Sequence, residues 1–146
     1  IQPGQEKREM GVKIKFSIVK GVLEGRTIVV VDDSIVRGTT SMLLIRLIKE
    51  ANPKEIHLRI SSPPIMHPCY YGMDFPSREE LIANKMHGNI KEIEKYLGVD
   101  SLEYLTIDEM LHAMKEVDPD NFCTACFFGN YPTPVDHTFN KEMYEI

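Results

Sequence analysis

The chain has 146 residues, a formal net charge of −5, and 42% hydrophobic and 27% charged residues. This length suits one globular domain with a modest core. The acidic balance argues against nucleic acid as the main partner, and no apolar run approaches the ~20 residues that a membrane span needs, so cytoplasm is the expected compartment.

The first stretch, residues 1–15, is rich in charge and contains a Pro-Gly turn at Pro3 and Gly4. Composition alone predicts a solvated surface segment. The sequence lacks an initial Met, and it contains fewer predicted strands than a doubly wound sheet needs. We therefore expect a piece of a longer, processed or partly ordered chain.

The run of β-branched residues at 28–31 predicts a strand that is buried on both faces. Asp32 and Asp33 follow it, and a polar loop leads to an apolar pattern that predicts a helix over 40–51. The loop therefore lies at the carboxyl end of a strand, where open α/β sheets bind ligands. Its further polar and glycine positions are Ser34, Arg37, Gly38, Thr39 and Thr40.

This loop has the chemistry of a sugar-phosphate site. Gly38 allows a ligand to approach the backbone closely, and the N–H groups at the start of the next helix favour an anion such as phosphate. The two carboxylates suit ligand hydroxyl groups or a Mg²⁺ ion. The alternative is a plain polar turn in which Thr39 is the helix N-cap.

The next elements predict a βαβ unit. The first helix should stop at Asn52 and Pro53, and the alternating residues 55–60 predict a second, parallel strand. The proline-rich loop 61–74 follows this strand at the same edge of the sheet. Ser61, Ser62 and Pro63 either line the same pocket or simply end the strand.

The remaining pattern predicts helices over 76–83, 89–96 and 107–117 and a short strand over 102–105. Ser77 and Glu80 have the spacing of a capping box, and Gly98 should end the second of these helices. We expect an α/β fold with a parallel sheet and flanking helices over 1–117, followed by a C-terminal tail over 118–146.

The three cysteines leave several interpretations open. Cys123 and Cys126 form a C-x-x-C pair, and Cys69 lies in the proline-rich loop. This spacing is compatible with a redox pair, a zinc site or an iron–sulfur cluster. Zinc and ordinary iron–sulfur sites need four ligands, one more than the three cysteines supply. Buried thiols without a ligand are the fourth possibility.

The string at 30–40 resembles the 5-phosphoribosyl 1-pyrophosphate (PRPP) binding motif of type I phosphoribosyltransferases. Its full wording, Val-Val-Asp-Asp-Ser-Ile-Val-Arg-Gly-Thr-Thr, resembles that of the glutamine PRPP amidotransferase family. The stretch from Ser61 to Ala83 and the residues Ile1, Pro3, Gln5 and Arg8 also resemble this family. The resemblance implies the second half of a type I phosphoribosyltransferase domain.

The resemblance also implies roles for individual residues. Asp32 and Asp33 would hold the ribose hydroxyls and take part in Mg²⁺ binding, while the loop up to Thr40 would cradle the 5′-phosphate. Gln5 and Arg8 would belong to a flexible lid, residues 1–20, that closes over PRPP. The cluster-bearing members imply that Cys69, Cys123 and Cys126 are ligands of a structural 4Fe-4S cluster, with the fourth ligand outside this chain.

Members of the family make 5-phosphoribosylamine, glutamate and pyrophosphate from PRPP, glutamine and water, the first step of purine synthesis. The resemblance implies an N-terminal glutaminase part, feedback inhibition by purine nucleotides, and a homo-oligomer; we expect this chain alone to be inactive. Two alternatives remain: a nucleobase phosphoribosyltransferase, disfavoured by the Cys69 loop and the tail, and a non-catalytic module that senses PRPP or nucleotides.

Overall fold

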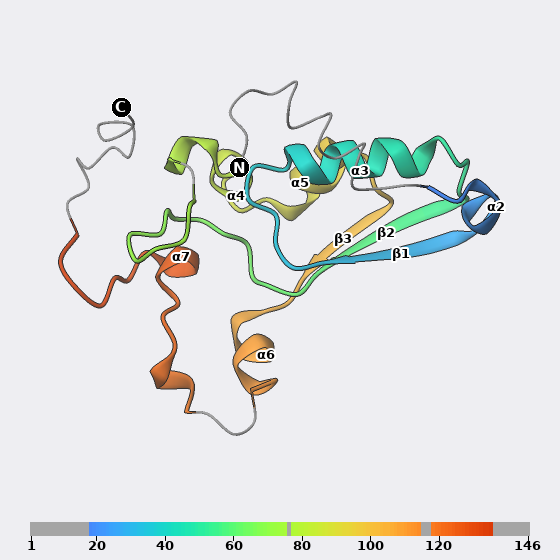
Figure 1. Ribbon diagram of the computed structural model, residues 1–146. Coiled ribbons are helices and arrows are strands. Elements are labelled where there is room, and N and C mark those ends of the chain that lie inside the picture. The colour runs from blue at the N-terminus through green and yellow to red at the C-terminus, as the bar shows by residue number, and fades with distance from the viewer. Residues whose placement is uncertain (1–17, 76, 115–117, 136–146) are drawn as a thin grey trace.

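The computed structural model describes residues 18–75, 77–114 and 118–135. In this part of the chain, three parallel strands form one sheet: β1 (Thr27–Asp32), β2 (Glu55–Ile60) and β3 (Ser101–Tyr104), in the order β1-β2-β3 (Figure 1). The expected parallel sheet with flanking helices is confirmed, and each predicted strand is found within one residue of its expected start.

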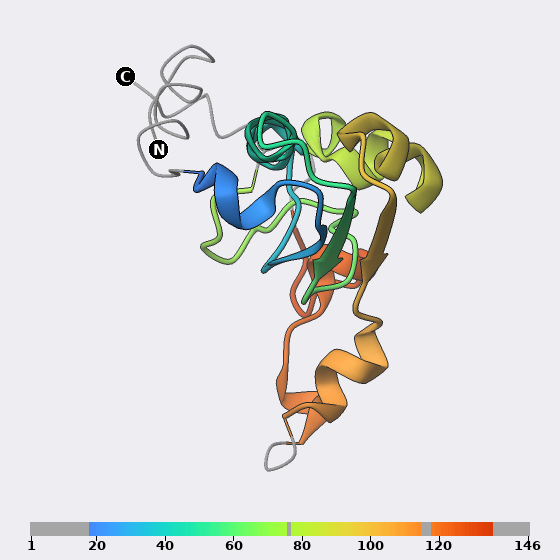
Figure 2. The same cartoon turned by 90° about the vertical axis from the view of Figure 1, so that its right-hand side faces the viewer.

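The helices that carry the core lie on one face of this sheet (Figures 1 and 2). These are α3 (Thr39–Lys49), α4 (Ile82–Lys85) and α5 (Ile90–Leu97). The short helix α2 (Lys20–Leu23) precedes β1. Beyond the carboxyl ends of the strands lie α6 (Ile107–His112), the 3₁₀ helix η2 (Pro119–Asn121) and α7 (Ala125–Phe128).

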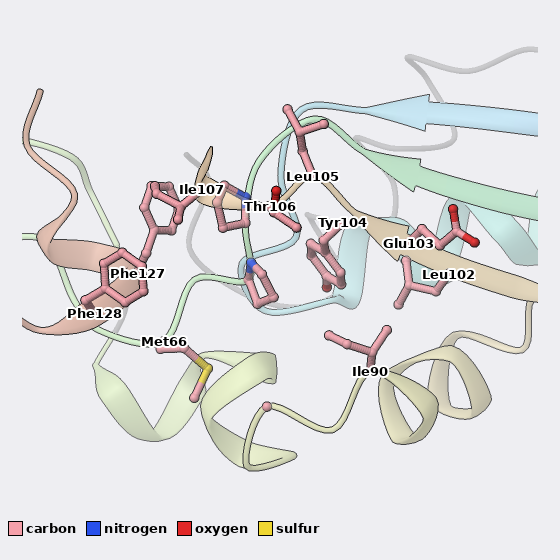
Figure 3. A pocket seen from close by; sticks show the side chains of 13 residues that line it. Met66, Ile90, Leu102, Glu103, Tyr104, Leu105, Thr106, Ile107, Phe127 and Phe128 are labelled. Carbon is pink, nitrogen blue, oxygen red and sulfur yellow. The ribbon is translucent and has the colours of Figure 1, made fainter. Parts of the chain in front are cut away.

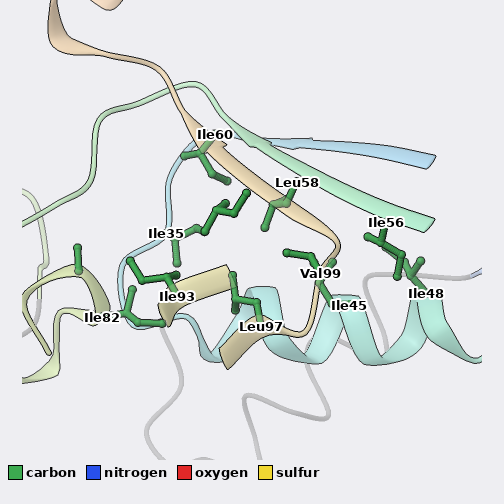
Figure 4. Close-up of a cluster of buried hydrophobic side chains, with 12 residues drawn as sticks. Ile35, Ile45, Ile48, Ile56, Leu58, Ile60, Ile82, Ile93, Leu97 and Val99 are labelled. Carbon is green, nitrogen blue, oxygen red and sulfur yellow. The ribbon is translucent and has the colours of Figure 1, made fainter. Parts of the chain in front are cut away.

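The core fills the space between the sheet and these helices (Figure 4). Every second residue of β2 is buried, so that Ile56, Leu58 and Ile60 face α3 and α5. The helices contribute buried residues at helical spacing, Ile45 and Ile48 from α3 and Ile93 and Leu97 from α5. Each fully buried side chain of this kind stabilises the fold by about 1.5–3 kcal/mol.

The prediction that β1 is buried on both faces is wrong. Ile28 and Val30 pack against the core, but Val29 and Val31 are 61% and 70% exposed. Within the described residues, α3, α4 and α5 cover only one face of the sheet, so alternate positions of β1 remain open. On the open face Arg59 donates a hydrogen bond to the Ser101 hydroxyl at 2.9 Å.

The structure also corrects two of the predicted helices. The segment expected as one helix over 76–83 forms a 3₁₀ helix η1 (Arg78–Glu80), which is separated from α4 by Leu81 in an extended conformation. The Ser77 side chain makes no capping hydrogen bond. The helix expected over 107–117 ends at His112, and residues 115–117 lie outside the described part.

Helix boundaries elsewhere are set by caps. Asn89 caps α5 by accepting hydrogen bonds from the N–H groups of Lys91 and Glu92, and Gly98 ends the helix in a left-handed conformation with φ 71°. A capping box does occur, but at the start of α6, between Thr106 and Glu109. In the part of the chain that the structure describes, no helix has the length and apolar character needed to cross a membrane.

Candidate functional site

The candidate site is the loop between β1 and α3. β1 ends at Asp32, whose carboxylate accepts a hydrogen bond from the Asp33 N–H at 3.0 Å. The Asp33 carboxylate in turn accepts one from the Ser34 N–H at 2.7 Å. These local bonds orient both carboxylates at the carboxyl end of the sheet, in the position that the sequence predicts.

In this arrangement the ionised form of the Asp32 carboxyl group is destabilised. Burial raises the pKa of its carboxyl group, and the neighbouring charge of Asp33 adds to this rise, although the Asp33 N–H opposes it. A carboxylate that is partly buried beside another is stabilised by a cation or by hydroxyl donors. The pair of oxygen-donor side chains is therefore suited to Mg²⁺ and to the hydroxyl groups of a sugar.

The start of α3 provides the anion-binding part of the site. Gly38 is the N-cap in a left-handed conformation with φ 77°, and the helix begins at Thr39, so the alternative in which Thr39 is the cap is wrong. Thr39 and Thr40 occupy the first turn, where backbone N–H groups have no partner within the helix. An anion at this point would also benefit from the dipole of an 11-residue helix.

A second segment, formed by η1 and α4, contacts this loop at three of its residues. The Ile82 N–H donates to the Val36 carbonyl at 2.9 Å. A Cβ atom at Gly38 would lie 2.5 Å from Cδ1 of Ile82, so a side chain there would force the end of the Ile82 side chain to move. The Arg37 Nε–H donates to the Glu80 carboxylate at 3.0 Å.

The structure thus brings most of the expected site residues into one loop: Asp32, Asp33, Ser34, Arg37, Gly38, Thr39 and Thr40. Ser61 joins them, because its N–H and hydroxyl both donate to the Asp32 carbonyl. Gln5 and Arg8 lie outside the described residues. Sequence reasoning did not connect Glu80 with this site, since it lies 43 positions after Arg37 and no local pattern links the two.

The cysteine-bearing tail packs against the loop that contains Cys69. The Cys126 carbonyl accepts hydrogen bonds from the N–H groups of Met66 and His67, at 3.0 and 2.9 Å. The Tyr131 hydroxyl donates to the Pro68 carbonyl at 2.8 Å. These contacts fix the C-x-x-C pair next to the proline-rich loop.

The three thiols are close enough to influence one another electrostatically. The pKa of Cys126 is raised to about 11, chiefly by burial and to a lesser extent by the neighbouring Cys69 and Cys123. All three are free thiols, and Cys123 is the exposed one. Their soft sulfur atoms suit iron or zinc as a partial ligand set. Among the described residues, however, no group of three or more His, Cys, Asp or Glu side chains forms a metal site.

A pocket of about 530 Å³ lies apart from the β1–α3 loop, between the end of β3 and the tail (Figure 3). Its lining is largely apolar and includes Met66, Ile90, Tyr104, Phe127 and Phe128. The Tyr104 hydroxyl is buried and has no hydrogen-bond partner among the described residues, and its burial raises the pKa of this phenol.

Comparison with known proteins places these features in one family. No family model matches the chain. Over 137 residues, or 94% of the chain, it is 56% identical to the chloroplastic amidophosphoribosyltransferase of Vigna aconitifolia, covering 28% of that protein. Over 138 residues, or 92% of the chain, it is 47% identical to the amidophosphoribosyltransferase of Bacillus subtilis, covering 29% of it.

Solved structures agree with the sequence comparison. The fold matches that of glutamine PRPP amidotransferase from B. subtilis complexed with ADP and GMP, with a TM-score of 0.76 and 46% identity over 94% of this chain and 30% of the other. The type I phosphoribosyltransferase fold is thereby established. The chain spans less than a third of the length of these relatives and matches their C-terminal part. Its sequence and fold match the C-terminal part of amidophosphoribosyltransferases.

Proposed function

We propose that this chain is the PRPP-binding part of an amidophosphoribosyltransferase. The whole protein would convert PRPP, glutamine and water to 5-phosphoribosylamine, glutamate and pyrophosphate, the first step of purine synthesis. The observation that carries the proposal is the β1–α3 loop, in which two carboxylates directly precede a glycine-capped helix N-terminus. The identity of 47–56% to proteins named amidophosphoribosyltransferase supports the same activity.

Each part of the loop would perform one task on PRPP. Asp32 and Asp33 would accept hydrogen bonds from the ribose hydroxyls and help to hold Mg²⁺, which supplies charge neutralisation for the pyrophosphate leaving group. Ser34 and the turn from Arg37 to Thr40 would hold the 5′-phosphate, largely through backbone N–H groups. Binding energy at this phosphate, remote from the reacting C1, can then be used for the reaction.

The lid is a further part of the proposal. Gln5 and Arg8 would close over bound PRPP and exclude water from the reacting centre. The glutaminase part of the protein would supply ammonia. Because the residues for glutamine hydrolysis are not among those that the resemblance identifies here, we expect this chain alone to be inactive.

We further propose that Cys69, Cys123 and Cys126 supply three ligands of a 4Fe-4S cluster, with the fourth from elsewhere in the protein. The hydrogen bonds between the proline-rich loop and the tail support this assignment, since they hold the cysteine-bearing segments together. The thiolates would serve a structural purpose, tying the tail to the domain.

Regulation and assembly belong to the same proposal. Purine nucleotides carry the sugar phosphate that the β1–α3 loop is suited to bind, and the solved B. subtilis relative is complexed with ADP and GMP. We propose feedback inhibition by such nucleotides, a homo-oligomeric protein, and a location in the cytoplasm, although several plant relatives are chloroplastic.

Pyrophosphate release from Mg·PRPP by the full-length protein tests the activity, with glutamine, ammonia and a panel of nucleobases offered in parallel. Release with glutamine or ammonia alone is the expected result. Release with a nucleobase would instead identify a nucleobase phosphoribosyltransferase. Binding of PRPP without release by the folded, cluster-loaded protein would favour a sensing module.

A further inference from the structure

Glu80 lies behind the β1–α3 loop, in the 3₁₀ helix η1, and its carboxylate is the one polar partner of the Arg37 side chain among the described residues. Glu80 Oε1 accepts from Arg37 Nε at 3.0 Å. The Arg37 side chain is 33% exposed and that of Glu80 is 50% exposed. Both side chains of the pair are therefore partly exposed to solvent.

The backbone around this pair is fixed by contacts on either side of it. Ile82, two residues after Glu80, donates its N–H to the Val36 carbonyl, one residue before Arg37. The Ile82 side chain also occupies the space next to Gly38. The pair, the backbone bond and this packing contact together connect η1 and α4 with the turn that leads into α3.

The hydrogen bond to Glu80 uses only the Nε–H group of the Arg37 guanidinium. A guanidinium carries five N–H donors in a rigid planar arrangement. A partner at Nε fixes this plane and leaves the N–H groups of both Nη atoms available. Arg37 can thus keep its ion pair with Glu80 while its remaining donors are available to an anion.

We infer that Glu80 is a positioning residue of the PRPP site, which fixes the phosphate-binding turn by holding the Arg37 side chain at Nε. Glu80 does not contact the ligand; it acts through Arg37. This inference rests on the proposed function, because it assigns Glu80 to the binding of the 5′-phosphate of PRPP.

If Glu80 acted only through its negative charge, its removal would change phosphate affinity in the opposite direction. Glu80 is an anion close to a site for anions, so removing its charge alone would strengthen phosphate binding. Removing a positioning hydrogen bond would weaken it. The variant Glu80→Gln keeps an amide oxygen that can accept from Nε, whereas Glu80→Ala removes the acceptor, and the two variants therefore separate the effects.

The experiment measures dissociation constants of the full-length protein for Mg·PRPP, ribose 5-phosphate and Mg·pyrophosphate by calorimetry. We expect Glu80→Ala to weaken binding of PRPP and ribose 5-phosphate about fivefold, which corresponds to the roughly 1 kcal/mol of a partly exposed ion pair. Binding of pyrophosphate, which has no 5′-phosphate, should not change. Glu80→Gln should recover most of the lost affinity.

Two controls make the assignment specific. Glu79→Ala removes the neighbouring carboxylate of η1 and should leave all three dissociation constants unchanged. In the Arg37→Ala background, Glu80→Ala should have no further effect, because its partner is already absent. Thermal unfolding of each variant separates a local loss of affinity from a general loss of stability.

The outcomes distinguish this inference from the function on which it rests. Failure of the wild-type protein to bind PRPP would refute the proposed function. Normal wild-type binding with no weakening in Glu80→Ala, or equal weakening for pyrophosphate and ribose 5-phosphate, would refute the role of Glu80. Tighter binding in both Glu80 variants would show that Glu80 acts only through its charge.

Discussion

Gly38 and Ile82 are packed so closely that a Cβ atom on the glycine would lie 2.5 Å from Cδ1 of the isoleucine. Gly38 also has a φ of 77°, a conformation that costs about 1–2 kcal/mol for a residue with a side chain. The turn into α3 therefore requires glycine for two independent reasons. Both reasons concern the position of the N–H groups that we propose to bind phosphate.

Gly38→Ala should weaken PRPP binding by more than about tenfold and lower the unfolding free energy by about 2 kcal/mol, the sum of strain and overpacking. Calorimetry and chemical denaturation measure the two effects. Gly21→Ala is the matched control, because a Cβ there meets no atom within 4 Å, and it should leave both quantities nearly unchanged. Normal PRPP affinity in Gly38→Ala would contradict the assignment of this turn.

Asp32→Asn should make the protein more stable at neutral pH, while it should abolish the proposed PRPP turnover of the full-length protein. Burial raises the pKa of Asp32 above its ordinary value of 3.8, so its contribution to stability is present at low pH and is lost as the pH rises through the folded-state pKa. The ionised carboxylate therefore disfavours folding at neutral pH. Asparagine removes this charge and keeps an oxygen that can accept from the Asp33 N–H.

Denaturant unfolding of both proteins from about pH 4 to pH 8 measures this difference. The stability advantage of Asp32→Asn should be largest at the neutral end and should shrink as the pH falls towards 3.8. A wild-type protein that is the more stable of the two at neutral pH would contradict a raised pKa.

The sheet could be predicted from sequence because its signals are local. β2 is found at the predicted residues, 55–60, since alternation of apolar and polar residues specifies a strand with one buried face. The exposure of Val29 and Val31 could not be predicted, because it depends on what covers the second face of the sheet. Four β-branched residues in sequence give no information on that.

The candidate loop could likewise be predicted, since all its members are within nine positions of one another. The contact of Glu80 with this loop could not be predicted. Glu80 fits the spacing of a capping box with Ser77, and local sequence favours that interpretation. In the structure the carboxylate instead meets Arg37, a contact between distant segments that only tertiary packing determines. The capping box that does form, at Thr106, was not predicted.

Thr106→Ala should therefore destabilise the start of α6 more than Ser77→Ala destabilises the start of η1, where the Ser77 side chain caps no backbone N–H group. The Thr106 hydroxyl accepts from the Glu109 N–H at 3.2 Å, and the Glu109 carboxylate accepts from the Thr106 N–H at 2.8 Å. Loss of such an N-cap typically costs about 1 kcal/mol. Hydrogen exchange of the first-turn amides of α6 measures the change, and equal effects of the two substitutions would contradict the structure.

Cys126 should react much more slowly with a disulfide reagent than Cys123 in the reduced, metal-free protein. Burial raises the pKa of Cys126 to about 11, so only about 0.1% of it is thiolate at pH 8. Cys123 is exposed. The rate at which Cys126 reacts should rise about tenfold per pH unit until the pH approaches its pKa.

Two double variants isolate the thiols for this measurement. Cys69→Ser with Cys123→Ser leaves Cys126, and Cys69→Ser with Cys126→Ser leaves Cys123. We expect at least a tenfold difference between their rates at pH 8, with Cys126 the slower because it is partly buried and its pKa is raised. Equal rates would show that the tail does not pack on the proline-rich loop in solution.

The cluster proposal predicts about four iron and four sulfide per chain in full-length protein prepared without oxygen. Serine at Cys69, Cys123 or Cys126 should abolish or greatly reduce the iron content, because each thiolate would hold one iron of the cluster. Thr124→Ala, a change between two of these cysteines that removes no sulfur ligand, should leave the iron content unchanged. Zinc as the sole metal in the wild-type protein would refute the cluster and would support a structural zinc site instead.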